Sequence, residues 1–176
     1  MIKRLLKLLH LTKSMDKKQF SPGCRLQTII SQNLYTNGFE LYIYNTKANM
    51  MKGIKKWLIK NHYQNTEVSQ DMLGVVYEYT KLKSVEYEDD NFQVFGAMFL
   101  NEPYLTMDII AHECVHAAMT LERNVIRYMG VYDGNDGSGQ APEERLAYTI
   151  GSFIDNILRA CIKKKINVKL VYEKTK

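Results

Sequence analysis

The chain has 176 residues, of which 45% are hydrophobic and 24% are charged, which is ordinary for a single globular domain and excludes a fibrous or wholly disordered chain. No apolar run approaches the roughly 18–20 residues that a membrane-spanning helix needs. The 24 Lys and Arg residues exceed the 19 Asp and Glu residues and give a net charge of +5, an excess too small to predict a nucleic-acid partner without a basic, aromatic stacking motif.

Residues 1–20 are expected to form an amphipathic helix followed by a polar linker. The helix would place Ile2, Leu5 and Leu9 on one apolar face, with lysines off that face. We expect this helix to dock on the body of the protein, residues 21–176, which is predicted to be a single domain. The alternative is a weak contact between residues 2–11 and a membrane surface.

The next segment contains strand signals and then a helix signal. Residues 26–30 and 39–44 are rich in β-branched and aromatic side chains, and an Asn-Gly turn signal just before the second run favours a hairpin. Between residues 50 and 58 the apolar side chains repeat at helical spacing. Asn45 or Thr46 is the expected N-cap of this helix.

The second half of the chain is expected to hold more strands and two long helices. Residues 72–79, 85–87 and 92–100 have strand composition. Apolar periodicity then predicts a helix over residues 106–127 and, after a glycine-containing loop, another over residues 143–163. These elements predict an α+β fold with a small, mostly antiparallel sheet. One helix is expected before the later strands of this sheet, and two helices are expected after its last strand.

The sharpest feature is the H-E-x-x-H motif formed by His112, Glu113 and His116, inside the first of these long helices. Side chains four residues apart lie on one face of a helix, so both imidazoles can reach one ion. Glu113 projects about 100° away from His112, where it can act on a metal-bound water. The motif therefore predicts a Zn²⁺ ion ligated by His112 and His116, with Glu113 as general base.

The motif leaves one protein ligand to be found, because catalytic zinc usually takes three and keeps a water in the fourth position. No histidine follows His116, so a carboxylate is expected. Glu144 is favoured, with Glu143 as the alternative, because an antiparallel helix pair would return this segment toward the motif. Glu144 also shares a helical face with Ala147 and Gly151, small residues that would let the two helices approach closely.

The combined pattern resembles a class of metallopeptidases. H-E-x-x-H followed by a glutamate on a later helix is the gluzincin arrangement. More narrowly, H-E-C-V-H-A-A, a loop and then E-x-x-A-Y-x-x-G resembles small zincin-like, metallopeptidase-like proteins of phages and mobile elements, over residues 92–158. The resemblance implies a minimal zincin-like fold, a zinc ion and a peptide or protein substrate.

The resemblance also implies a strand that binds substrate. In zincin folds the strand just before the metal helix is an edge strand, and the substrate peptide pairs with it. Residues 92–100 occupy that place in this sequence. Gly96 and Ala97 are therefore expected to leave room for an incoming peptide backbone.

These assignments predict a zinc-dependent peptide hydrolase. Glu113 would take a proton from the attacking water, and Tyr148 would donate to the oxyanion, with Tyr104, Tyr128 and Tyr132 as alternative donors. The alternative function is a zincin-fold binding or structural protein of a virion or a host interaction, in which zinc is not catalytic. The three cysteines form no C-x-x-C pair, which favours a reducing, cytoplasmic location, and nothing in the sequence sets the oligomeric state.

Overall fold

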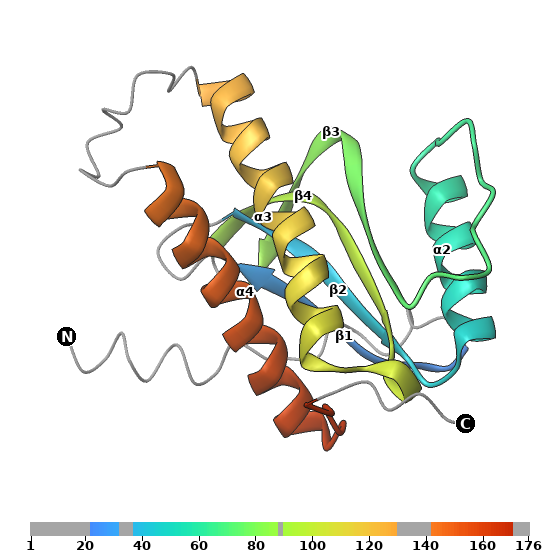
Figure 1. Ribbon diagram of the computed structural model, residues 1–176. Coiled ribbons are helices and arrows are strands. Elements are labelled where there is room, and N and C mark those ends of the chain that lie inside the picture. The colour runs from blue at the N-terminus through green and yellow to red at the C-terminus, as the bar shows by residue number, and fades with distance from the viewer. Residues whose placement is uncertain (1–21, 32–36, 88–89, 130–141, 171–176) are drawn as a thin grey trace.

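The computed structural model describes residues 22–31, 37–87, 90–129 and 142–170 (Figure 1). The predicted N-terminal helix and linker, residues 1–20, lie outside this part of the chain. In chain order the described elements are β1 (Cys24–Ser31), β2 (Asn37–Tyr44), α2 (Lys47–Lys60), β3 (Gly74–Tyr87), β4 (Asp90–Asn101), the short 3₁₀ helix η2 (Glu102–Tyr104), α3 (Met107–Met129) and α4 (Pro142–Lys164).

The strands form one four-stranded sheet in the order β1-β2-β4-β3. β1 pairs antiparallel with β2, and β3 pairs antiparallel with β4, whereas the central pair, β2 and β4, is parallel. A parallel pair needs a long connection, which α2 and β3 provide here. The predicted α+β class is therefore confirmed, but the sheet is mixed.

Local sequence signals place several elements correctly. The hairpin of β1 and β2 is confirmed by their antiparallel pairing. Of the two candidate caps for α2, Thr46 is the N-cap, and its hydroxyl accepts a hydrogen bond from the Asn49 amide at 3.2 Å. The predicted strands 72–79 and 85–87 are one continuous strand, β3, because its pairing with β4 resumes beyond an irregularity between Glu78 and Lys83.

The sheet separates two hydrophobic layers. α2 covers one face, and α3 and α4 lie side by side over the other (Figure 1). Successive side chains of β2 alternate between these layers, so Leu41 packs under α3 and α4 while Tyr44 packs under α2. Phe153 of α4 is fully buried against the Phe39 ring, edge to face at 5.9 Å between centroids. Across the described residues, no helix combines the length and apolar character needed to cross a membrane.

A buried carboxylate ties α2 to the sheet. Glu40 of β2 is only 4% exposed. Its Oε2 atom accepts hydrogen bonds from the Tyr79 hydroxyl at 2.8 Å, the Tyr42 hydroxyl at 3.0 Å and the Trp57 indole N–H at 3.2 Å. These donors compensate the desolvation of the carboxylate, so Glu40 ties α2 to the strands β2 and β3.

Candidate active site

Three hydrogen bonds fix the start of α3, the helix that carries the H-E-x-x-H motif. The Thr106 hydroxyl accepts a hydrogen bond from the Ile109 amide at 3.4 Å, as an N-cap does. The Met107 amide donates to the Lys169 carbonyl at 2.9 Å, and the Lys169 amide donates to the Leu105 carbonyl at 3.0 Å. The C-terminal segment therefore anchors the first turn, and the motif begins within the second turn.

The two histidines of the motif converge on one point at the surface of α3. Both side chains are exposed, and their Nε2 atoms lie 3.1 Å apart. Two nitrogens that bind one tetrahedral zinc ion at about 2.0–2.1 Å lie roughly 3.3 Å apart. The imidazoles of His112 and His116 are thus already spaced as adjacent ligands of a single zinc ion, as their helical spacing predicted.

Glu113 turns from the exposed face of α3 toward the sheet. The residue is only 6% exposed, and burial raises the pKa of its carboxyl, an effect that the neighbouring His112 partly offsets. Its carboxylate lies against Gly74, the first residue of β3. A Cβ at that position would lie 2.8 Å from Glu113 Cγ and 3.0 Å from Glu113 Oε1, so the absent side chain of Gly74 leaves the space that Glu113 occupies.

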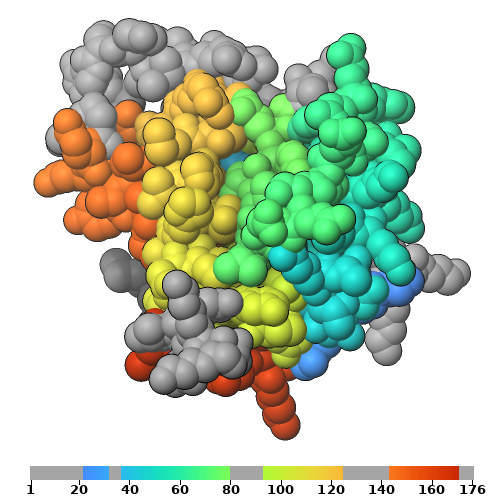
Figure 2. All heavy atoms as spheres, turned by 45° about the vertical axis from the view of Figure 1, so that its right-hand side comes forward, coloured from blue at the N-terminus to red at the C-terminus, as the bar shows by residue number. Residues whose placement is uncertain are grey.

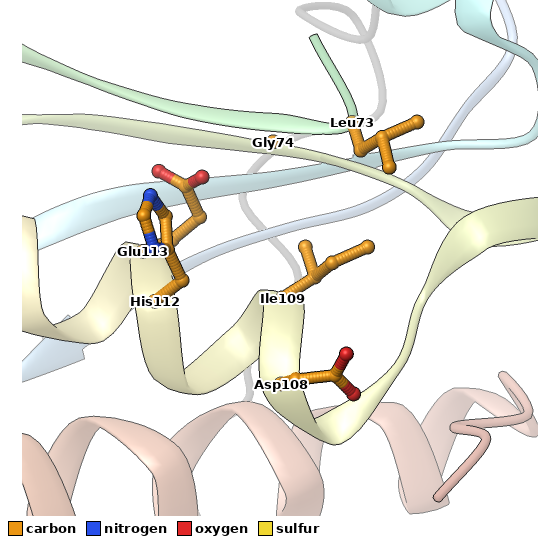
Figure 3. Close-up of a pocket in the computed structure, with 6 residues that line it drawn as sticks. All are labelled: Leu73, Gly74, Asp108, Ile109, His112 and Glu113. Atoms are coloured by element: carbon orange, nitrogen blue, oxygen red, sulfur yellow. The ribbon is translucent and has the colours of Figure 1, made fainter. Parts of the chain in front are cut away.

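A pocket of about 410 Å³ lies between α3 and the start of β3. α3 and the segment leading into β3 lie side by side on the face shown in Figure 2. Figure 3 shows the Glu113 carboxylate beside the His112 ring at one end, Ile109 between these residues and the start of the helix, and Leu73 across from Ile109 on the segment that leads into β3. The six lining residues are Leu73, Gly74, Asp108, Ile109, His112 and Glu113.

The structure does not bring Glu144 to the two imidazoles. Arg145 forms an ion pair with Glu122 at 3.2 Å, which sets α4 against α3. Glu122 lies six residues past His116, roughly 9 Å farther along the helix axis. Among the described residues, no three His, Cys, Asp or Glu side chains are grouped so that they could hold a metal ion, and this includes both Glu144 and Glu143.

The face of α4 that was expected to pack closely against α3 points to solvent instead. Glu144, Ala147 and Gly151 are exposed, and a Cβ added at Gly151 would meet nothing within 4 Å. α4 buries the opposite face, which carries Thr149 and Phe153. The expectation of a close helix–helix approach through small residues is therefore wrong, because helical periodicity places Glu144 away from the buried face.

The oxyanion donor is not identified by this geometry. Tyr148 is 65% exposed on α4 and Tyr104 is 37% exposed on η2, and neither lines the pocket. The side chains of Tyr128 and Tyr132 lie outside the described part of the chain. Tyr148 thus receives no support from its position.

The strand before α3 is not an edge strand, contrary to the prediction. β4 is paired with β2 on one side and with β3 on the other. A Cβ at Gly96 would collide with the Tyr77 carbonyl oxygen of β3, and Ala97 is fully buried. Neither residue can receive a substrate backbone, because neighbouring strands already occupy the space beside them. In the described sheet the edges are β1 and β3.

Four pocket residues were not predicted as site residues. Asp108 and Ile109 precede His112 by four and three residues, so helical spacing alone could have placed them beside it. Leu73 and Gly74 are distant in sequence and reach the motif only through the pairing of β3 with β4. No local signal could have found them.

Comparison with known proteins adds nothing to this geometry: no protein-family model, curated protein or solved structure matches the chain. The chemistry of the site therefore has to be argued from its own residues, which are two converging imidazoles and a buried carboxylate beside an open pocket.

Proposed function

We propose that the chain is a zinc-dependent peptide hydrolase of zincin type, with His112 and His116 as metal ligands and Glu113 as general base. The observation that carries this proposal is the 3.1 Å separation of the two Nε2 atoms, with the Glu113 carboxylate held nearby at the mouth of a pocket. The donor set is also appropriate, because neutral imidazoles are common zinc ligands.

Each residue then has a defined task. Zinc, when bound, would lower the pKa of a coordinated water and polarise a carbonyl. Glu113 accepts the proton of the attacking water and passes it to the leaving amine. Its burial favours this role, because a raised carboxyl pKa makes protonation during turnover easier. The exposure of both imidazoles leaves the site accessible to a large substrate.

We propose Glu144 as the third ligand, with Glu143 as the alternative, on the strength of the sequence pattern. Both are exposed in the first turn of α4, so binding would require this turn to move toward α3. The test is zinc affinity in the Glu144→Gln and Glu143→Gln variants. A loss of zinc affinity in only one variant, larger than the roughly ten- to hundredfold typical of an outer-shell partner, identifies the ligand, and no change in either one rejects both.

A peptide substrate is favoured by the free edge of β3. In the described sheet β3 pairs only with β4, and its first residue, Gly74, lines the pocket beside Glu113. A peptide that pairs with this edge would carry its backbone past the motif. The role that the sequence assigned to β4 is therefore proposed for β3.

A zinc-binding protein without catalysis is the second candidate. It is favoured by one observation, the absence of a three-ligand group among the described residues. Fold and metal ligands alone do not establish turnover. If the chain binds zinc without catalysis, the Glu113→Gln variant would keep both the zinc content and the binding or structural function of the wild type.

The deciding experiment uses the full chain and two matched pairs of variants. Zinc content is measured after dialysis for wild type, His116→Ala and the control His62→Asn, which suits the positive φ of 60° at this site. We expect one zinc per chain, lost only in His116→Ala. Cleavage of unfolded casein is then compared in Glu113→Gln and Glu67→Gln, an exposed control. Turnover that survives Glu113→Gln would contradict the proposed base.

A further inference from the structure

The pocket beside His112 has a chemical character that selects one class of substrate side chain. We propose that it binds the side chain of a lysine or arginine of the substrate peptide, with the Asp108 carboxylate pairing with the cationic end. This inference rests on the proposed function and names the substrate class of the same site.

The lining of the pocket matches the two parts of a long basic side chain. Leu73 and Ile109 give it apolar walls, and Asp108 lies at the start of the helix, apart from Glu113 and His112 (Figure 3). Lysine and arginine bury an apolar stem while keeping the charged end in a polar setting. The pocket offers both environments, with apolar walls for the stem and the exposed Asp108 carboxylate for the charged end.

The dimensions agree with this assignment. Asp108 precedes His112 by four residues, which is about 6 Å along the axis of α3. An extended lysine side chain spans about 6 Å from Cα to its ammonium nitrogen, given ordinary bond lengths. A substrate backbone passing His112 could therefore place the charge of its side chain beside Asp108.

The charge of the pocket also favours a cation. Apart from Glu113, which the proposed function assigns to the metal-bound water, the lining carries the Asp108 carboxylate and neither lysine nor arginine, although the whole chain carries +5. Within the described part of the chain Asp108 forms no ion pair, even with Lys169, whose backbone is bonded to the adjacent Met107. Asp108 also complements the positive end of the α3 dipole, but that role does not depend on the pocket.

The test reads side-chain preference directly. Full-length protein loaded with zinc is incubated with a library of short peptides, blocked at both ends and randomised in the middle, and the cleaved bonds are sequenced by mass spectrometry. Wild type should show lysine and arginine enriched by up to about fivefold at one position near the cleaved bond, as expected for an exposed charge pair. Asp108→Asn should lose this enrichment, and Asp108→Lys should replace it with enrichment of Asp and Glu.

The control is Asp155→Asn, which makes the same charge change on α4 at a residue that does not line the pocket. It should keep the wild-type preference. Cleavage without basic preference, or a preference unchanged by Asp108→Asn, would overturn the proposed pocket while leaving the hydrolase intact.

A second arm separates this inference from the proposed function. The same library is passed over immobilised Glu113→Gln protein, and the retained peptides are identified. If wild type cleaves nothing, the hydrolase proposal fails, yet retention of basic peptides that depends on Asp108 would still support the pocket. Retention without basic preference would reject the pocket as well.

Discussion

Gly74→Ala tests how Glu113 is positioned. The new Cβ would lie 2.8 Å from Glu113 Cγ, 3.0 Å from Glu113 Oε1 and 3.0 Å from Leu100 Cδ2, all inside ordinary contact distance. Leu100 is fully buried, so the less constrained Glu113 side chain has to move. A displacement approaching 1 Å costs about a hundredfold in rate when it misplaces a reacting group. We expect kcat/KM for peptide cleavage to fall roughly tenfold to a hundredfold.

Stability should respond differently from activity. Overpacking costs about 1–3 kcal/mol, and replacing glycine by alanine returns about 0.4–1 kcal/mol through the unfolded chain. Gly74→Ala should therefore lower the free energy of unfolding by about 2 kcal/mol or less while keeping its zinc. Gly151→Ala is the control, because its Cβ meets nothing within 4 Å. The assays are casein cleavage, urea denaturation and zinc analysis. Wild-type turnover in Gly74→Ala would refute the positioning argument.

Three further predictions concern the scaffold and use urea denaturation. Glu40→Leu should lower the free energy of unfolding by about 3 kcal/mol or more, since it removes the carboxylate that accepts three hydrogen bonds, two of them buried. Arg145→Met should cost about 1–2 kcal/mol, because its ion pair is mostly buried, whereas Arg159→Met, which removes an exposed pair, should leave the free energy of unfolding nearly unchanged. Burial raises the pKa of the Cys114 and Cys161 thiols from 9.0 to about 12. The unfolded chain therefore loses these protons at a lower pH than the folded chain does. The two thiols should contribute fully to the free energy of unfolding below pH 9, and this contribution should decline between pH 9 and pH 12. A free energy of unfolding that does not decline in that window would contradict the prediction.

The sequence could predict the features that depend on helical spacing. The convergence of His112 and His116 follows from their separation along one helix, and the N-cap of α3 follows from Thr106 at its start. The position of Asp108 follows from the same spacing, since it precedes His112 by four residues.

The features that depend on long-range packing could not be predicted. β4 became internal because β3 folds back beside it, and strand composition carries no information about that order. The orientation of Glu144, by contrast, follows from helical periodicity, which places it off the face of α4 that buries Thr149 and Phe153. Gly74 reaches Glu113 only when β3 pairs with β4 and α3 packs over the sheet, so its role emerges from the three-dimensional structure alone.

The proposed function requires that the imidazoles of His112 and His116 share one zinc ion. Crystals of the full chain, grown with zinc and measured at the zinc absorption edge, would show whether they do. We expect one anomalous peak about 2.0–2.1 Å from both Nε2 atoms. A map with no peak between these rings, or with zinc bound only at other residues, would contradict it.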